Sequence, residues 1–207
     1  MSRKWRNRIR LIVCLLLVLC GAAYLLFQLR YAPLVKKAAM LKMDNDAAGV
    51  INDAIESVVE SGKVDYSKLV TLEKGSDGTV TVLKSNMAAI NELKYDILDA
   101  VSQRILDFST EKITLPAGSI FFPEFFSGHG PEIPIRLATL RSSGAQLESR
   151  FSDAGINQTR HEIIVVVSIE VTIVTPAGTI DVPVSSNAVV AETIIVGGVP
   201  DTFVTLG

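Results

Sequence analysis

The sequence contains few of the side chains that most often carry out chemistry. Its 207 residues include two cysteines and two histidines, and both cysteines, Cys14 and Cys20, lie in one uncharged apolar run. The rest of the chain therefore has no thiol nucleophile, no thiolate metal site and no disulfide. The G-x-S-x-G motif of hydrolases and the Walker motif of nucleotide-binding proteins are also missing. The sequence predicts no catalytic residue, no cofactor and no small-molecule substrate.

Metal-binding patterns are incomplete. Residues 44–56 begin with the spacing of a calcium loop, but Ala48 and Ile55 occupy positions that need oxygen ligands. A zinc site built from His129, His161 and a distant carboxylate has no ligand spacing to support it. The sequence therefore predicts no metal site.

One long apolar run is present. Leu11–Leu29 carries no charge, and its 19 residues would span roughly 28 Å as a helix, enough to cross the hydrocarbon core of a bilayer. Five basic residues precede it: Arg3, Lys4, Arg6, Arg8 and Arg10. The positive-inside rule then predicts a cytoplasmic N-terminus (1–10), a transmembrane signal anchor (11–29), a juxtamembrane helix segment (30–43) and an extracytoplasmic domain (44–207).

The alternative to an anchor is a cleaved signal peptide. Gly21 and Ala23 have the spacing of a cleavage site, but the apolar run continues through Tyr24–Phe27, which favours an uncleaved anchor. Trp5 and Tyr31 fall near the two ends of the span, where amphipathic rings prefer the membrane interface.

The chain after Arg30 is acidic. It contains 14 Lys and Arg against 22 Asp and Glu, a net charge of −8. Nucleic-acid binding needs a basic surface, so we expect no nucleic-acid partner.

Hydrophobic periodicity predicts an α+β domain, with two helices packed on a mainly antiparallel sheet. One helix includes the apolar positions of residues 50–59 and ends near Gly62; the other covers Met87–Ser109 after an Asn86 cap. Residues 69–86 read as a hairpin turning at Gly75 and Gly78. The remaining strands are expected at 133–140, 146–152, 159–175 and, in pieces, 180–196, with a turn at 175–179.

A segment rich in glycine and proline follows Pro116 and contains four phenylalanines: Phe121, Phe122, Phe125 and Phe126. We interpret it as a loop whose aromatic side chains fill the core. The alternative is an exposed apolar patch for a partner or for the membrane surface.

The stretch "AGINQTRHE" (154–162) places polar residues before a run of β-branched ones. On a strand, Arg160 and Glu162 share one face and His161 lies on the other. The pattern favours the solvated start of a strand over catalysis. A surface for partner recognition, using Arg160, His161 and Glu162, is the second interpretation.

Several motifs together resemble the YunB family of sporulation proteins of endospore-forming Firmicutes. They are "INDAI" (51–55), "LVTLEK" (69–74), "GHGPEIPI" (128–135), "AGINQTRHEI" (154–163) and "AETIIVGGVPDTF" (191–203). The aromatic "FFPEFF" (121–126) departs from the family pattern, in which smaller and more polar residues are expected.

The resemblance implies a single-pass protein of the mother-cell (outer forespore) membrane that is needed for spore formation and has no known catalytic residue. We expect it to act by assembly with itself or with other sporulation proteins of the envelope. The alternative is a peptidoglycan-modifying enzyme or wall-binding module, for which Glu162, Glu192 and Asp201 are the first candidates.

Overall fold

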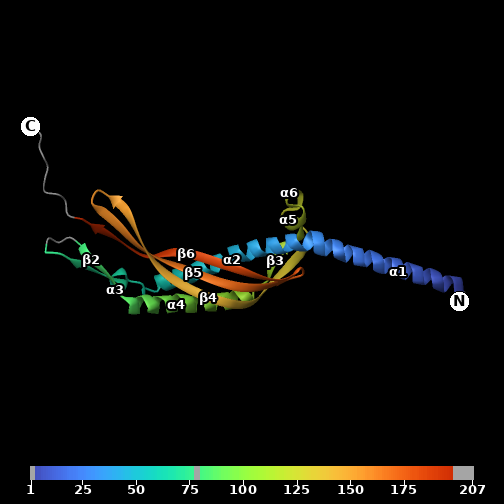
Figure 1. Ribbon diagram of the computed structural model, residues 1–207, viewed down its shortest axis with the longest axis horizontal. Coiled ribbons are helices and arrows are strands. Elements are labelled where there is room, and N and C mark those ends of the chain that lie inside the picture. The colour runs from blue at the N-terminus through green and yellow to red at the C-terminus, as the bar shows by residue number, and fades with distance from the viewer. Residues whose placement is uncertain (1–2, 77–79, 198–207) are drawn as a thin grey trace, which may run out of the picture. The chain divides into compact units, whose positions relative to one another are not determined.

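The computed structural model describes residues 3–76 and 80–197 and shows an α+β protein with antiparallel sheets, as predicted (Figure 1). The elements, in chain order, are α1 (Arg3–Leu26), the π-helix η1 (Phe27–Tyr31), α2 (Ala32–Glu60), α3 (Tyr66–Leu69), β1 (Val70–Lys74), β2 (Val80–Ser85), α4 (Met87–Ser109), β3 (Ile113–Pro116), α5 (Ala117–Phe121), α6 (Pro123–Phe126), β4 (Glu132–Gly155), β5 (Gln158–Thr175) and β6 (Gly178–Val196).

The apolar run is helical and continues without a break into α2. Within the described residues, one helix, Arg10–Glu60, is long and apolar enough to cross a membrane, judged by its length and composition. Its side chains are exposed from Arg10 to Leu26. An apolar helix whose side chains are all exposed fits a membrane anchor, because lipid can cover what no protein group covers.

Pro33 explains the π-helical turn between α1 and α2. A proline has no backbone N–H, and its ring collides with the carbonyl four residues earlier, here that of Leu29. The wider turn of η1 surrounds that carbonyl and lets the helix pass the proline without ending. Helices α1 and α2 are therefore joined through η1 into one continuous helix.

The chain divides into two compact units. The first contains Met1–Met43, Lys112–Ala138 and Thr172–Asp181, and the second contains Asp44–Glu111, Thr139–Val171 and Val182–Gly207. Helix α2 and strands β4, β5 and β6 contribute residues to both units. Each unit has its own buried residues.

The core of the second unit is built from the stripes that the sequence predicts. Helix α4 buries five side chains: Leu93, Ile97, Val101, Ile105 and Phe108. Its N-cap is Asn86, whose side-chain oxygen accepts a hydrogen bond from Ala89 N. From α2 the unit buries Ala47, Ile51, Ala54, Ile55 and Val58, and from β5 it buries His161, Ile163, Ile164, Val165, Val167, Ile169 and Val171. Burial at alternate positions of β5 marks one face of the sheet as the packed face.

The strands form two sheets: the hairpin β1–β2, and a four-stranded sheet in the order β3-β4-β5-β6. Strands β1 and β2 pair antiparallel, which confirms the predicted hairpin, and their register shifts at Glu73/Lys74. Gly78, expected in the turn of this hairpin, lies outside the described residues. Two-residue turns join β4 to β5 and β5 to β6. The first contains Asn157 at φ 58° and follows Gly155 at φ 130°, and most residues avoid both conformations.

The first unit packs around the start of α2. Ala32, Val35 and Ala177 form a buried cluster, against which four partly buried apolar side chains pack: Phe27, Ile120, Phe121 and Ile133. Strand β3 adds the pair Ile113–Ile135, in which both side chains are buried.

Three features differ from the sequence prediction. Strand β4 runs unbroken from Glu132 to Gly155, although two strands, 133–140 and 146–152, were expected. Strand β6 also runs unbroken, although it was expected in pieces. The segment expected to be a loop after Pro116 instead forms the short helices α5 and α6.

Candidate functional site

His161 is the most unusual polar group in the described chain. Its side chain is fully buried, with 0% relative exposure, on the packed face of β5. Tyr66 Oη lies 2.6 Å from His161 Nδ1 and forms a hydrogen bond with it. The Phe151 ring, from β4, stacks on the imidazole with a centroid separation of 4.4 Å and an interplanar angle of 16°. All three side chains belong to the second unit.

Helix α3 holds Tyr66 in position. Asp65 caps this helix and accepts hydrogen bonds from Ser67 Oγ at 2.8 Å and from Ser67 N at 2.9 Å. The side-chain bond from Ser67, with help from the backbone bond, lowers the pKa of Asp65. The cap fixes the first turn and so directs the Tyr66 ring toward His161, which it meets edge-on at 5.6 Å.

The Tyr66–His161 pair is neutral. Burial lowers the pKa of His161 and raises the pKa of Tyr66, so each group resists becoming charged. The hydrogen bond therefore joins a phenol to a neutral imidazole. The other ring nitrogen, Nε2, is buried with no hydrogen-bond partner among the described residues, which disfavours protonation further.

Burial decides what this cluster can do. A substrate cannot reach a side chain with no exposed surface, so the geometry does not favour His161 as a catalytic base. The same burial removes His161 from any surface that a partner could touch, which corrects its place in the predicted recognition surface. The neighbouring side chains alternate as predicted: Arg160 is exposed and Glu162 is half-buried.

The aromatic segment of the first unit is folded by close backbone contacts. Gly118 N donates to His129 O and Ala117 N donates to Pro131 O, both at 2.9 Å. A Cβ at Gly118 would collide with Phe126 O and lie 2.5 Å from His129 O. Only glycine fits there, and its small size lets α5 lie against the chain that follows α6.

Three of the four phenylalanines face outward. Phe122, Phe125 and Phe126 are 61%, 80% and 57% exposed. The core-filling interpretation is therefore wrong for these three. Phe121 differs, because it is half-buried against the Ala32 cluster and its ring meets Tyr31 edge-on at 5.3 Å.

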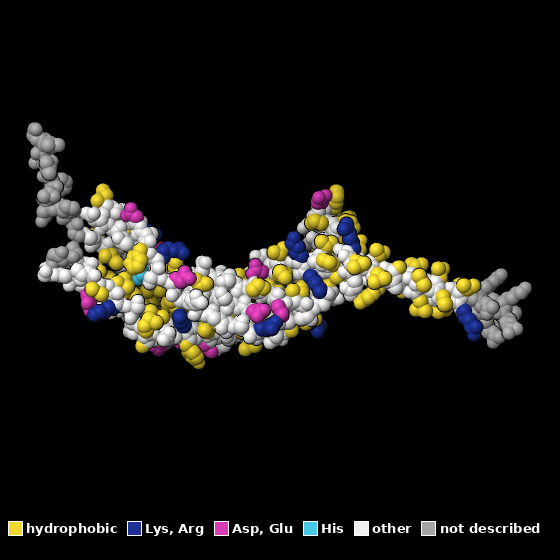
Figure 2. Space-filling view, viewed as in Figure 1, with side chains coloured by type: hydrophobic (Ala, Val, Ile, Leu, Met, Phe, Trp, Pro, Cys, Tyr) yellow, Lys and Arg dark blue, Asp and Glu magenta, His cyan; other side chains and the backbone are white. Residues whose placement is uncertain are grey.

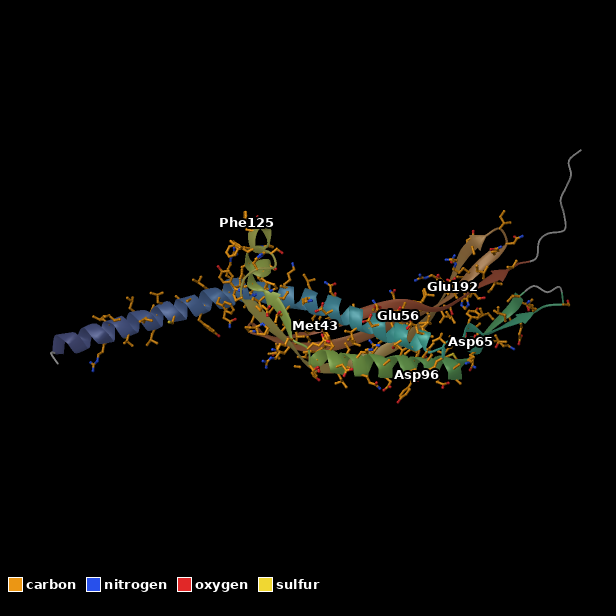
Figure 3. The ribbon with its side chains drawn as sticks, turned by 180° about the vertical axis from the view of Figure 1, so that it is seen from behind. Met43, Glu56, Asp65, Asp96, Phe125 and Glu192 are labelled. Atoms are coloured by element: carbon orange, nitrogen blue, oxygen red, sulfur yellow. The ribbon has the colours of Figure 1, made fainter. Side chains whose placement is uncertain are left out.

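The candidate residues of the enzyme hypothesis are described in part. Glu192 is exposed on β6 (Figure 3), and Asp201 lies outside the described residues. His129 is exposed, and its Nδ1 lies 2.9 Å from Ser127 O. Within residues 3–76 and 80–197, no group of three or more His, Cys, Asp or Glu side chains could hold a metal ion.

Two surface pockets lie near polar or aromatic side chains. One, of about 300 Å³, lies between α3 and α4, where Lys63 and Asp96 form a salt bridge of 3.1 Å at its edge. The other, of about 260 Å³, is lined by Phe121, Phe122, Phe126 and neighbouring residues of the aromatic segment. The first is lined by the charged side chains Lys63, Lys68, Glu92 and Asp96, and the second is lined mainly by apolar side chains.

Comparison with known proteins agrees with the motif resemblance. Residues 112–202 match the family described as Sporulation protein YunB. Over these residues the chain is similar to the YunB family. The matched YunB segment includes three of the five motifs in whole or nearly so, from residue 128 to residue 202, while "INDAI" and "LVTLEK" precede it. No curated protein and no solved structure shows a significant match.

Within the YunB match, sequence reasoning selected His161 but missed two of its neighbours. Tyr66 lies 95 positions earlier in the chain, so no local spacing links it to the histidine. Phe151 lies on β4 beyond a turn, where it read as an ordinary strand residue. The only available signal was that a histidine interrupts an alternating apolar face, which suggests a buried polar group in need of a partner.

Proposed function

We propose that this chain is a membrane-anchored sporulation protein that acts without catalysis, by assembling with further copies of itself along strand β6. The YunB family supplies the sporulation role, and the apolar helix fits the anchor. The observation that carries the assembly step is the character of β6 in the second unit.

Strand β6 is an edge strand with almost no charge. Among the described strands its only hydrogen-bonded neighbour is β5. Residues 184–196, thirteen in all, contain Glu192 as their single charged side chain. Val189, Ile194 and Val196 are 48%, 50% and 61% exposed on this stretch. An edge of this kind is a template for pairing with another strand.

The opposite edge of the sheet is protected. Strand β3 pairs with β4 only from Glu132 to Ile135, so the rest of β4 has β5 as its one described neighbour. That rest carries five charges: Arg136, Arg141, Glu148, Arg150 and Asp153. Charged side chains discourage edge pairing, so β6 is the edge better suited to assembly.

A second copy is the occupant that the charge pattern favours. Two β6 strands paired antiparallel would bring together two nearly uncharged stretches, with no cluster of like charges to repel. Anchoring raises the local concentration of copies in the membrane, so a modest edge contact is enough for association.

The proposed location follows from charge and family. The basic residues before Leu11 favour a cytoplasmic N-terminus and an extracytoplasmic domain. In a sporulating cell this orientation in the mother-cell membrane would place the domain between the two membranes around the forespore, where copies could assemble.

The test is a count of heat-resistant spores from a deletion strain complemented with variants. Val189→Lys should reproduce the deletion defect, because a lysine on β6 opposes edge pairing. Val174→Lys is the matched control: Val174 is 43% exposed against 48% for Val189, but β5 has a neighbour on each side. Protein levels of all strains are compared by immunoblot.

Glu162→Gln and Glu192→Gln test the enzyme alternative in the same assay. We expect both to sporulate like the intact protein. If either behaved like the deletion at normal abundance while Val189→Lys sporulated normally, catalysis would replace assembly as the explanation.

A further inference from the structure

The exposed phenylalanines lie on a segment with few charges. Between Ala117 and Pro131 there is no lysine or arginine, and Glu124 is the only acidic residue. Figure 2 shows apolar side chains both along α1 and on the projection that α5 and α6 form. Exposed apolar side chains gathered on one projection need a covering surface.

The projection is attached to the helix where the apolar run ends. Phe121 contacts Tyr31, two residues beyond Leu29, and packs in the same cluster as Phe27. Phe121, Tyr31 and Phe27 all belong to the first unit, together with α1, α5 and α6. In Figures 1 and 3 the projection leaves the helix sideways, and Phe125 lies at its outer end.

We propose that Phe122, Phe125 and Phe126 insert into the interfacial layer of the same membrane that α1 crosses. If α1 spans the bilayer, Leu29 and Tyr31 lie at the interface. A projection fixed sideways at this level runs along the membrane surface. Aromatic side chains are favoured at this depth, and the lack of basic residues makes the contact apolar and not a recognition of anionic headgroups.

Glu124 limits the depth of insertion. This carboxylate is exposed between Phe122 and Phe125 in the sequence and has to stay at the level of the headgroups. The rings therefore enter the interface and not the hydrocarbon centre. The second contact would fix the tilt of the anchor helix. The inference needs the anchor but not β6 pairing, so either proposal can fail alone.

Tryptophan fluorescence of the full chain tests the insertion. Trp5 is the only tryptophan, so Trp5→Phe provides the background for Phe125→Trp, in phosphatidylcholine vesicles whose lipids carry bromine near the headgroup or near the chain ends. We expect a blue-shifted emission from Phe125→Trp and a larger loss of fluorescence with the shallow bromine. Leu106→Trp, at a residue 63% exposed on α4 in the second unit, is the control and should lose less.

Equal quenching of the two positions would overturn the proposal. So would an emission from Phe125→Trp that acrylamide cannot quench and bromine does not affect, since a protein surface would then cover the ring. Phe122→Trp repeats the measurement if the first variant fails to fold, as judged by circular dichroism.

Discussion

At the scale of single residues, the buried His161 should make the stability of the fold depend on pH. His161 is held neutral by burial, with Tyr66 on one ring nitrogen and Phe151 stacked over the ring. A charged imidazole there would be buried, and among the described residues its hydrogen-bond partner is the Tyr66 phenol and not a carboxylate, so protonation and folding oppose each other.

Because of this residue, the free energy of unfolding should decrease as the pH is lowered. The pKa of His161 is lowered in the folded protein, while a histidine in the unfolded chain has a pKa of about 6.5. Below that pH the unfolded state binds more protons, so stability that is fully present at higher pH is lost as the pH falls toward and through the folded pKa. Urea denaturation of the full chain in nonionic detergent measures this pH dependence of stability, from about pH 5 to pH 8, the range in which histidine titrates.

His161→Phe should remove most of that pH dependence, whatever it does to stability at neutral pH. His129→Phe is the matched control, because His129 is exposed and the variant should keep the dependence of the intact chain. Equal slopes for the two variants would show that His161 is not the group responsible.

At the scale of elements, short sequence patterns predicted the helices and strands that depend on neighbouring residues. The stripe of α4, its Asn86 cap and the β1–β2 hairpin follow from spacing that can be read over a few residues. The sequence did not predict that β4 is a single strand. Ser142–Gly144 has the composition of a loop, but pairing with the neighbouring strand β5 keeps it extended. The Tyr66–His161 contact depends on residues far apart in the chain, which no local pattern records.

Two glycines should respond in opposite directions to the same change. Gly118→Ala should destabilise the chain by about 1–3 kcal/mol, because the added methyl group meets backbone oxygens of Phe126 and His129. Gly49→Ala should stabilise it by about 0.5–1 kcal/mol, because Gly49 lies within α2 with nothing within 4 Å of the new methyl group. Urea denaturation measures both; a stabilising Gly118→Ala would contradict the tight packing of α5.

At the scale of the whole molecule, an apolar helix suited to membrane attachment is joined to a sheet with a nearly uncharged edge. The family match suggests a sporulation role, and the apolar helix fits attachment to a membrane. The proposed step between them is association of copies along β6, where thirteen residues contain one charge. Assembly of this kind spreads its energy over a strand, so a charge placed on the edge should matter more than the loss of any one carboxylate.

The most direct test is a cysteine cross-linking scan of β6 in native membranes. With Cys14 and Cys20 replaced by serine, single cysteines are placed at Val189, Ala191 and Thr193, and at Val174 on β5 as the control. An antiparallel pair of identical strands brings one position opposite its own copy, so we predict dimers that peak at one β6 position and are absent at Val174. Equal cross-linking at every position, or none on β6, would contradict assembly through this edge.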